Sequence, residues 1–358
     1  MKKKKLLFFG YTMQMGGAER ALVNVINVIK DYYDIDLILL EAKGELINDI
    51  PKDVNIIQIR NNIFSYCLFR FIPFFRKRKI NKLTNKKYDI ACAFMEGRAA
   101  TWLIDMKQDC YKIAWIHNDV NAFNIGISDK EIVNTYSKLD KIYVVSIQSM
   151  NNFCQKYNIP KEKAEVIYNL IDEDDILKKA SLFKPEKNKF TFVNVAKMRK
   201  QKRHDRLLEC AYNLKKKGYD FQLWLVGNGP LYDDVKKQID DLKLNDVVTL
   251  WGLKENPYPY VKEADYFVMS SDHEGYPLSL LESLLLKTPV VTTDVSGARE
   301  ILKESKYGVI CEIDTDSLTN AMEEVINNDH KEFRENLRYY KGSNEEIIKQ
   351  LLKIFKVK

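Results

Sequence analysis

Short apolar runs, rich in β-branched and aromatic residues, alternate with helical patterns along most of this chain of 358 residues. Runs such as LLFFGYT (6–12) and FTFVNVA (190–196) are followed by segments in which apolar residues recur every three or four positions. Because these runs are apolar on both faces of the strand, they predict parallel sheets that helices cover on both sides. The predicted fold class is therefore α/β, with doubly wound sheets.

A charged stretch at 172–189 separates two series of predicted strands, and it contains Pro185. We therefore expect an N-terminal Rossmann-like domain over residues 1–171, a linker over 172–189 and a C-terminal Rossmann-like domain over 190–343. An amphipathic helix is expected within 344–358. Ligands of doubly wound folds lie beyond the carboxyl ends of the strands, so the pattern predicts a ligand site in the loops there, facing a cleft between the domains.

The net charge of +7 is concentrated in one part of the chain. Residues 60–87 carry nine Lys and Arg and no Asp or Glu. Aromatic residues interleave with these cations: Phe64, Tyr66, Phe69, Phe71, Phe74 and Phe75. Cations beside aromatics are typical of a segment that meets an anionic membrane surface. The alternative is that the aromatics belong to the core and the charges to solvent. Nothing else in the sequence supports a nucleic-acid partner.

The first residues imitate a signal peptide, with a lysine run and then an apolar one. The apolar run, Leu6–Phe9, is too short for the hydrophobic region of a signal peptide, and no stretch approaches the roughly 20 apolar residues of a transmembrane helix. We therefore expect a cytoplasmic protein that is peripheral on the inner face of the membrane through residues 60–87.

The loop after the first predicted strand contains Gly16 and Gly17, directly before a helical pattern. A glycine pair allows a tight turn, and it lets backbone N–H groups approach a phosphate at the helix N-terminus. The loop lacks the spacing GxGxxG, and a turn without a ligand accounts for it equally well.

The segment EGYPLSLLE joins a predicted strand to an apolar helix. Glu274 would lie at the carboxyl end of the strand, and the backbone N–H groups of 275–278 would begin the helix, which suits a sugar diphosphate. Glu282 follows among leucines, where an ionised carboxylate requires a partner. An ion pair with Lys287 or Arg299 would satisfy it, as would the hydroxyl groups of a ligand.

Two further candidate elements follow predicted strands. Lys197 and Lys202 belong to a basic loop of the second series, where they either neutralise a departing diphosphate or lie in solvent. His117 ends an apolar strand of the first series, where a structural role is common. Asp119, two residues further on, could orient the imidazole or cap a turn.

Five motifs occur in order between Phe8 and Val325: GGAER, WIHND, QKRHDRLLEC, LVGNGPL and EGYPLSLLE. With the spacing E-x7-E of Glu274 and Glu282, this set resembles the retaining glycosyltransferases of family 4, which have the GT-B fold of two facing Rossmann-like domains. The resemblance implies an acceptor-side N-terminal domain and a C-terminal domain that binds a nucleotide sugar. It also implies that the last helix, Asn344–Phe355, crosses back to the first domain.

The resemblance assigns roles to single residues. Catalytic roles fall to His117, Glu274 and Lys202. Donor-binding roles fall to Gly16, Gly17, Lys197, Lys202, Gly275, Tyr276, Pro277, Leu278 and Glu282. In this assignment the glycine pair approaches the diphosphate and Glu282 accepts the ribose hydroxyls. Lys197 stands where the family usually has arginine, which keeps the charge and loses the bidentate geometry.

The expected function is that of a retaining hexosyltransferase. It would move a sugar from a nucleotide-diphosphate donor, with a UDP-sugar favoured, to a glycan acceptor in cell-surface polysaccharide or glycan assembly. The acceptor would be polyprenyl-linked if residues 60–87 meet a membrane. No cofactor and no metal are expected, because the D-x-D triplets at 34–36 and 314–316 are interpreted as chance in a chain with 50 acidic residues.

Three alternatives stay open at this point. A sugar-nucleotide epimerase of GT-B type would turn over its nucleotide sugar without an acceptor. A non-catalytic protein could bind a nucleotide sugar through the same residues. A dinucleotide-dependent oxidoreductase has a candidate ribose-binding acid in Glu41, and it lacks the GxGxxG loop.

Overall fold

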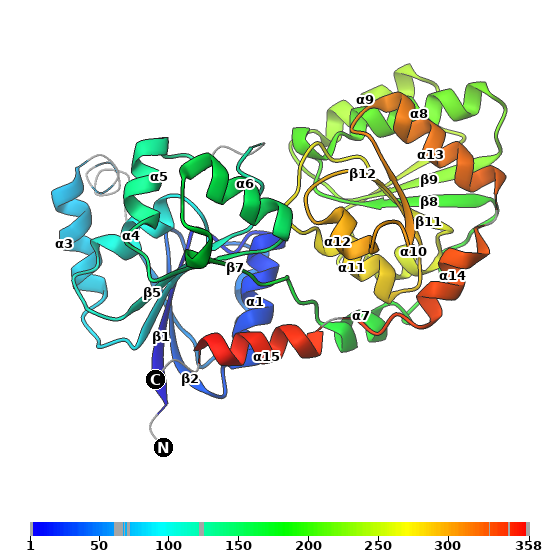
Figure 1. The fold of residues 1–358 in the computed structure, drawn as a ribbon. Coiled ribbons are helices and arrows are strands. Elements are labelled where there is room, and N and C mark those ends of the chain that lie inside the picture. The colour runs from blue at the N-terminus through cyan, green and yellow to red at the C-terminus, as the bar shows by residue number, and fades with distance from the viewer. Residues whose placement is uncertain are drawn as a thin grey trace. The chain divides into compact units, whose positions relative to one another are not determined.

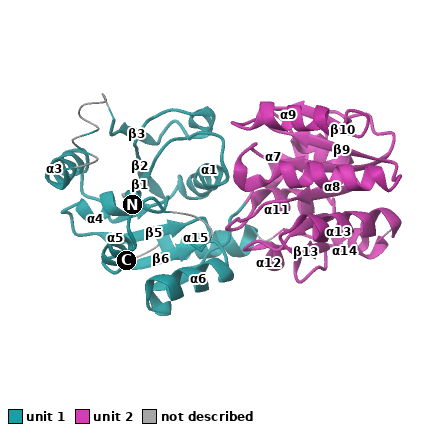
Figure 2. Cartoon of the chain, turned by 90° about the horizontal axis from the view of Figure 1, so that it is seen from above, with its two compact units in different colours: residues 1–170, 344–358 teal, residues 171–343 magenta. Residues whose placement is uncertain are grey.

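The computed structural model of the chain describes residues 3–60, 67, 69, 72–121, 125–328, 330–342 and 344–355. These residues form two compact units, of which the first comprises residues 1–170 and 344–358 and the second comprises residues 171–343 (Figure 2). Each unit is built around its own parallel sheet. The predicted α/β class is confirmed, because every strand pair in both sheets is parallel.

The first unit contains a seven-stranded sheet with the order β3-β2-β1-β4-β5-β6-β7. Its strands are β1 (Lys4–Gly10), β2 (Tyr33–Leu39), β3 (Asn55–Gln58), β4 (Ile90–Ala93), β5 (Tyr111–Ile116), β6 (Lys141–Val144) and β7 (Ala164–Val166). Its helices are α1 (Gly17–Ile29), α3 (Pro73–Leu83), α4 (Arg98–Asp105), α5 (Asp129–Tyr136), α6 (Ile147–Tyr157) and α15 (Asn344–Phe355), with 3-10 turns η1 (Glu45–Asp49) and η2 (Lys161–Lys163).

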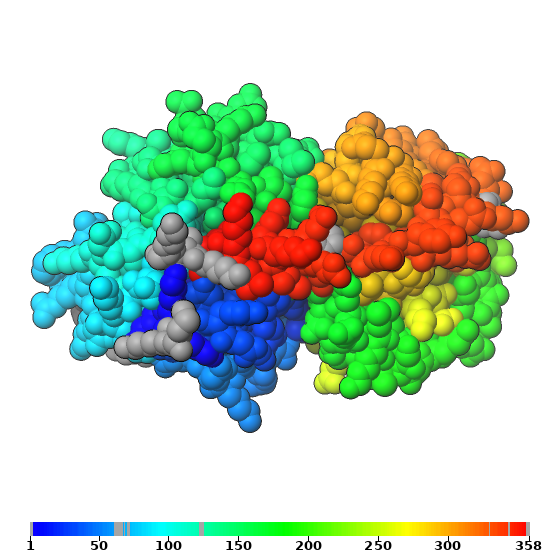
Figure 3. Space-filling model, turned by 60° about the horizontal axis from the view of Figure 1, so that its bottom comes forward, coloured from blue at the N-terminus to red at the C-terminus, as the bar shows by residue number. Residues whose placement is uncertain are grey.

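Strand β1 is apolar on both faces because helices cover the sheet on both sides (Figure 1). Leu7 and Phe9 point into the core that includes residues of α4, α5 and α6. Phe8 points to the opposite side, where its ring meets Phe355 of α15 edge-on at 6.1 Å. Helix α15 thus packs on the first unit, beside the N-terminal residues shown in blue in Figure 3.

The second unit contains a six-stranded sheet with the order β10-β9-β8-β11-β12-β13. Its strands are β8 (Phe190–Val195), β9 (Phe221–Val226), β10 (Val248–Gly252), β11 (Tyr266–Met269), β12 (Val290–Thr293) and β13 (Gly308–Cys311). Its helices are α7 (Glu173–Lys179), α8 (His204–Lys216), α9 (Tyr232–Asp241), α10 (Tyr258–Glu263), α11 (Leu278–Leu285), α12 (Ala298–Leu302), α13 (Thr315–Asn327) and α14 (Lys331–Arg338), with the 3-10 turn η3 (Lys200–Lys202).

Two elements of the second unit differ from the sequence-based description. Residues 172–189, which we expected to be a linker, include helix α7, which packs against α10 and α11. Strand β13 was not predicted, because it has only four residues and follows a loop rich in lysine and serine. It pairs with β12 and extends the sheet beyond the last predicted strand.

The strand orders of the two sheets define where ligands would bind. In each sheet the chain starts in the middle, at β1 or β8, and then adds strands on one side before it crosses to the other. The points of reversal lie between β1 and β4 and between β8 and β11. Loops diverge at the carboxyl ends of such strand pairs, which is where ligands of open α/β sheets bind.

Among the described residues, no helix is long and apolar enough to cross a bilayer.

Candidate functional site

In the second unit, Lys202 and Glu274 meet at the point where the strand order reverses. Lys202 lies in the loop after β8 and Glu274 in the loop after β11, and these strands are neighbours. The Lys202 Nζ donates to Glu274 Oε1 at 2.5 Å, with the two side chains 23% and 11% exposed. Two residues 72 positions apart are thus paired by the topology of the sheet. The pair offers both a cation and a carboxylate to a polar ligand.

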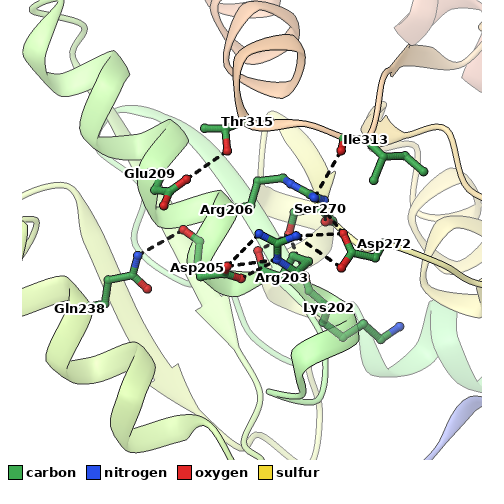
Figure 4. A network of polar contacts seen from close by, with 10 residues as sticks. All are labelled: Lys202, Arg203, Asp205, Arg206, Glu209, Gln238, Ser270, Asp272, Ile313 and Thr315. Carbon is green, nitrogen blue, oxygen red and sulfur yellow. Dashed lines mark hydrogen bonds and ion pairs between the residues drawn. The ribbon is translucent and has the colours of Figure 1, made fainter. Parts of the chain in front are cut away.

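A polar network fixes the backbone on both sides of this pair (Figure 4). The Ser270 hydroxyl donates to the Lys202 carbonyl oxygen at 2.9 Å, and the buried Arg206 donates to the Ser270 carbonyl oxygen at 2.8 Å. Arg206 and Arg203 also pair with Asp272. Figure 4 shows the Lys202 side chain directed away from this network. The surrounding cations are therefore structural, whereas Lys202 leaves the network to meet Glu274.

The residues after Glu274 form the N-terminus of helix α11, with Pro277 as the N-cap. Among the described residues, the backbone N–H groups of Gly275 and Leu278 donate to no other group. Gly297, directly before α12, packs closely against this loop. A Cβ at this position would lie 2.8 Å from the Gly275 carbonyl oxygen, and its φ of 80° is one that glycine adopts readily. Tyr276 is buried against the same glycine. The helix N-terminus consequently carries two unengaged donors next to Glu274.

Glu282 lies in the second turn of α11, and the Tyr258 hydroxyl donates to its Oε1 at 3.4 Å. The two cations considered as its partners bond elsewhere. The Lys287 Nζ donates to the Tyr340 carbonyl oxygen, and Arg299 pairs with Asp294. Both cations therefore have other partners in the second unit.

Lys197 stands in the loop directly after β8. Its ammonium forms no hydrogen bond or ion pair with the described residues, so it is available to an anion.

A cavity of about 470 Å³ lies on α8 and α9 and is lined in part by Lys200, Arg203 and His204. None of the residues that we predicted to bind a donor lines it.

In the first unit, Gly16 caps helix α1 and Gly17 is its first residue. The Glu19 carboxylate folds back over this end of the helix. Its Oε2 lies so close to Gly16 that a Cβ on that residue would be only 2.3 Å away. An acidic side chain at the third helical position is a common partner for the N-terminus. The space beside Gly17 is open, with no atom within 4 Å of the position of a Cβ. The glycine pair therefore starts the helix as predicted, although a carboxylate already lies at that terminus.

His117 follows β5 and is buried among aromatic rings. Its ring centroid lies 4.8 Å from that of Phe94, and its plane is nearly parallel to that of Trp115, with centroids 6.5 Å apart. Neither ring nitrogen makes a hydrogen bond of good geometry with the described residues. Burial lowers the pKa of His117 to about 4, and the Phe94 backbone acts in the opposite direction to a smaller extent. The imidazole is neutral at pH 7, and neither of its nitrogen atoms makes a well-formed hydrogen bond with the described residues.

The protonation of His117 can be followed directly by NMR, since the chain has four histidines. We expect the His117 ring signal to stay unchanged between pH 5.5 and 8, because the lowered pKa keeps the ring neutral throughout that range. The variant His117→Gln identifies the signal by its disappearance. A titration midpoint near the ordinary histidine value of about 6.5 would contradict the buried position described here.

Asp119 does not orient the imidazole. Its Oδ1 accepts from the Asn121 N–H at 2.9 Å and its Oδ2 accepts from the Asn152 side chain at 2.7 Å. Of the two roles considered for it, the structure shows the capping of a turn.

A functional candidate that sequence analysis missed is Glu96, in the loop after β4. This carboxylate is 7% exposed and receives hydrogen bonds from the His117 N–H and the Asn118 side chain. Burial raises its pKa, while the hydrogen bonds from Asn118 and nearby backbone lower it by less. The signal available in the sequence was its position two residues after the apolar run YDIACAF (88–94), at the same end of the sheet as His117.

The two D-x-D triplets have structural partners. Asp36 is buried and accepts hydrogen bonds from Lys86, Tyr88 and Asn55. Asp314 caps α13 by accepting from the Ser317 N–H at 2.7 Å. Within the part of the chain that the structure describes, no cluster of three His, Cys, Asp or Glu residues could hold a metal ion.

The basic aromatic segment at 60–87 is described only in part. Phe64, Tyr66 and Phe71 lie outside the described residues. Phe69 is buried against Trp102, as the core interpretation predicted. Phe74 and Phe75 lie on α3 and are 65% and 43% exposed. This helix therefore presents two aromatic rings together with several cations, which are Lys77, Arg78, Lys79 and Lys82, whereas Arg76 is mostly buried in an ion pair with Asp105.

Two family models match the chain, one in each half. Residues 15–175 match the model described as Glycosyltransferase Family 4, and residues 174–343 match the model described as Glycosyl transferases group 1. The matched ranges together extend from the glycine loop after β1 to the end of the second unit.

Curated relatives match over nearly the full chain. The N-acetylgalactosamine-N,N'-diacetylbacillosaminyl-diphospho-undecaprenol 4-alpha-N-acetylgalactosaminyltransferase of Campylobacter jejuni is 28% identical over 91% of this chain and 91% of its own length. The O-antigen biosynthesis glycosyltransferase WbnH of Escherichia coli is 26% identical over 93% of both chains.

The solved structures extend this likeness to the fold. The crystal structure of Anabaena Alr3699/HepE in complex with UDP and glucose has a TM-score of 0.78 and 18% sequence identity, and covers 99% of this chain and 100% of that one. The crystal structure of Staphylococcus aureus TarM in complex with Fondaparinux, alpha-GlcNAc-glycerol and UDP has a TM-score of 0.77 at 15% identity.

Proposed function

Because this chain is a glycosyltransferase of the GT-B fold, we propose that it moves a hexose from a UDP-sugar to a lipid-linked glycan, with retention of configuration at the sugar. The observation that carries the donor assignment is the pairing of Lys202 with Glu274 beside the unengaged N-terminus of α11. A nucleotide sugar combines a diphosphate, which cations and helix N-termini stabilise, with hydroxyl groups that carboxylates bind.

UDP is the favoured nucleotide for two reasons. The solved structures of HepE and TarM, which share the fold, contain UDP. In the second unit, the uracil is proposed to lie near residues 252–256, after β10, where Lys254 stacks over the Trp251 ring at 5.4 Å. Glu282 is proposed to accept the ribose hydroxyls; the Tyr258 hydroxyl that donates to its Oε1 lies 3.4 Å away, at the long end of a hydrogen bond.

The proposed reaction breaks the bond between the sugar C1 and the diphosphate oxygen. Negative charge then grows on the leaving diphosphate, where Lys202 and Lys197 stabilise it more strongly than in the ground state. Glu274 positions Lys202 and accepts sugar hydroxyls. The acceptor hydroxyl attacks C1 on the face that the diphosphate leaves, and a phosphate oxygen of the departing group receives the proton.

The first unit is proposed to act on the same donor. His117 is neutral at pH 7 and neither of its ring nitrogens makes a hydrogen bond of good geometry, so it can donate one hydrogen bond and accept another without adding charge. Gly16 and Gly17 are proposed to approach the diphosphate, which requires the Glu19 carboxylate to move from the N-terminus of α1.

Replacement of Glu282 tests the ribose assignment. We expect Glu282→Ala to weaken UDP binding about 10²- to 10⁴-fold, since two hydrogen bonds to a charged acceptor contribute about 1.5–3 kcal/mol each. Isothermal titration calorimetry with UDP measures this affinity. Glu300→Ala, on α12 in the same unit, is the control. UDP affinity equal to that of the wild type would remove the ribose role from Glu282.

The acceptor is proposed to be a polyprenyl-diphosphate-linked glycan. The Campylobacter jejuni relative carries diphospho-undecaprenol in its name, and the Escherichia coli relative belongs to O-antigen biosynthesis. A lipid-linked acceptor requires access to a membrane surface. Helix α3 offers exposed Phe74 and Phe75 with a group of cations, which is the composition of an interfacial segment.

Binding to vesicles tests the membrane assignment. We expect the protein to sediment with vesicles of anionic phospholipid at low salt and to be released as salt is raised, because each basic residue near the surface contributes about 1 kcal/mol. The double variant Lys77→Glu/Arg78→Glu should reduce the bound fraction strongly, whereas Lys236→Glu/Lys237→Glu on the exposed side of α9 should not. Absence of binding at low salt would refute the assignment.

A further inference from the structure

We propose that Glu96 is a positioning residue that fixes the turn of His117 and Asn118, so that the neutral imidazole is presented to the donor. The inference rests on the proposed function in one respect, which is that the ligand contacted by His117 is the sugar donor. Its structural part, the control of the turn by Glu96, stands on the contacts of the first unit alone.

Glu96 lies at the point where the strand order of the first sheet reverses. It follows β4, which is a neighbour both of β1, with the glycine loop, and of β5, with His117. The Glu96 Oε2 accepts from the His117 N–H at 3.3 Å, and its Oε1 accepts from the Asn118 side-chain amide. The carboxylate therefore bonds to two consecutive residues of the turn that carries the imidazole.

The loop around Glu96 is held firmly by two tyrosine hydroxyls. The Tyr11 hydroxyl donates to the Glu96 carbonyl oxygen at 2.8 Å, and the Tyr136 hydroxyl accepts from the Gly97 N–H at 3.0 Å. Gly97 has a φ of 82°, and a Cβ there would lie 2.4 Å from the Ile125 carbonyl oxygen. The backbone has little freedom, so the carboxylate has one position from which to hold the turn.

The energetic argument comes from a comparison with Asp36, a second buried carboxylate of this sheet. Asp36 pairs with Lys86, and together with two further hydrogen bonds this pairing lowers its pKa in spite of burial. Glu96 has no ion-pair partner among the described residues, and its pKa is raised by burial. A buried carboxylate without a cation is costly to the fold. The unfavourable burial of the Glu96 carboxylate is therefore explained by the hydrogen bonds that it makes to the His117 turn.

The nitrogen atoms of the imidazole that Glu96 supports are poorly satisfied. Both are buried and neither makes a hydrogen bond of good geometry with the described residues, whereas buried polar groups are nearly always paired. The Phe94 backbone acts on the ring only weakly, in the direction of a hydrogen bond. The ring also packs against Phe94, with centroids 4.8 Å apart, and Phe94 in turn contacts Trp115 at 4.9 Å. A ring that packs against Phe94, and whose backbone is held by Glu96, is arranged to bind a polar group of a ligand.

Exchange of the partners at this contact tests the inference. Asn118→Asp places a second carboxylate against Glu96, so that one of the two must bind a proton. The carboxyl group that binds this proton has a raised pKa. Below that pKa the shared proton keeps the turn in its native conformation, and above it the two carboxylates repel each other and the turn is displaced. In Glu96→Gln/Asn118→Asp the new amide can donate to the new carboxylate and accept from the His117 N–H, which restores the arrangement.

The first readout is independent of any activity. We expect the His117 ring signal in a carbon–proton NMR spectrum to shift in Asn118→Asp at pH 8 and to return in Glu96→Gln/Asn118→Asp. The control Asp36→Asn perturbs the other buried carboxylate of the sheet and should leave the His117 signal in place. An unshifted signal in Asn118→Asp, or a shift that the double variant does not reverse, would overturn the positioning role.

The second readout links the turn to the reaction. We expect Asn118→Asp to reduce kcat about 10- to 100-fold at pH 8, with a smaller change in KM for the donor and partial recovery at pH 6, because misplacement of a contact group by about 1 Å can cost that much. The double variant should recover most of the loss. Unchanged kcat together with a shifted His117 signal would limit Glu96 to a structural role. If wild-type protein turns over no nucleotide sugar, the proposed function fails while the NMR result still decides the role of Glu96.

Discussion

Replacement of Lys202 by alanine should lower kcat for sugar transfer by about 10²- to 10³-fold, because it removes a preorganised cation from the position where the leaving diphosphate develops charge. The structure places its Nζ 2.5 Å from Glu274 Oε1, across the strand reversal of the second sheet. Initial rates of nucleoside diphosphate release, measured with a coupled assay, report this effect. The affinity for the donor should fall by a smaller factor, since the ground state carries less charge at that oxygen.

The variant leaves Glu274 without its cation, so the loss must be separated from a disturbed loop. Lys202→Gln keeps a hydrogen-bond donor for Glu274 without the charge and should stay about as slow as Lys202→Ala. Lys215→Ala breaks an exposed lysine–carboxylate pair with Asp246 in the same unit and should keep the wild-type rate. A Lys202→Ala enzyme with kcat within threefold of the wild type would contradict the assigned role.

Replacement of Phe355 by alanine should destabilise the first unit by about 3–5 kcal/mol, the usual cost of a large-to-small change in a core. Phe355 is fully buried, and its ring meets Phe8 of β1 and Tyr33 of β2 edge-on, each at 6.1 Å. The last helix in the sequence thus completes the core beside the first strand. Hydrogen exchange measured by mass spectrometry should show faster exchange in β1 and β2.

The effect should be confined to the unit that α15 completes. Exchange in β8 and β11 of the second unit should be unchanged, because Phe355 belongs to the first unit alone. Phe74→Ala, which removes a ring that is 65% exposed, is the matched control and should leave both units unaltered. Equal acceleration in both units, or none in β1, would contradict the packing of α15 described here.

The α/β class could be predicted from the sequence because parallel strands that are covered on both faces read as continuous apolar runs. Leu6 to Phe9 are all fully buried, which explains why the first strand was recognisable. Strand β13 escaped prediction, since four residues at a sheet edge carry little periodic signal. Helix α7 was missed because its seven residues are mostly charged, with only Ile176 buried.

The candidate site was predictable only where a motif lies within one loop. Glu274 and the start of α11 are local, so the spacing E-x7-E locates them. The pairing of Lys202 with Glu274 spans 72 positions and follows from the strand order, which the sequence does not display. Glu96 was missed for the same reason, since its bonds to His117 and Asn118 cross 21 and 22 positions between neighbouring strands.

The most direct test of the central claim is a proton NMR time course of the purified chain with UDP-sugars and a polyprenyl-diphosphate-linked glycan. The account predicts release of UDP and a new glycosidic linkage whose anomeric configuration equals that of the donor, with both signals lost in Lys202→Ala. A product of inverted configuration would contradict the retaining reaction. Conversion of the donor into another UDP-sugar without release of UDP, or persistence of the donor with no UDP formed, would contradict glycosyl transfer itself.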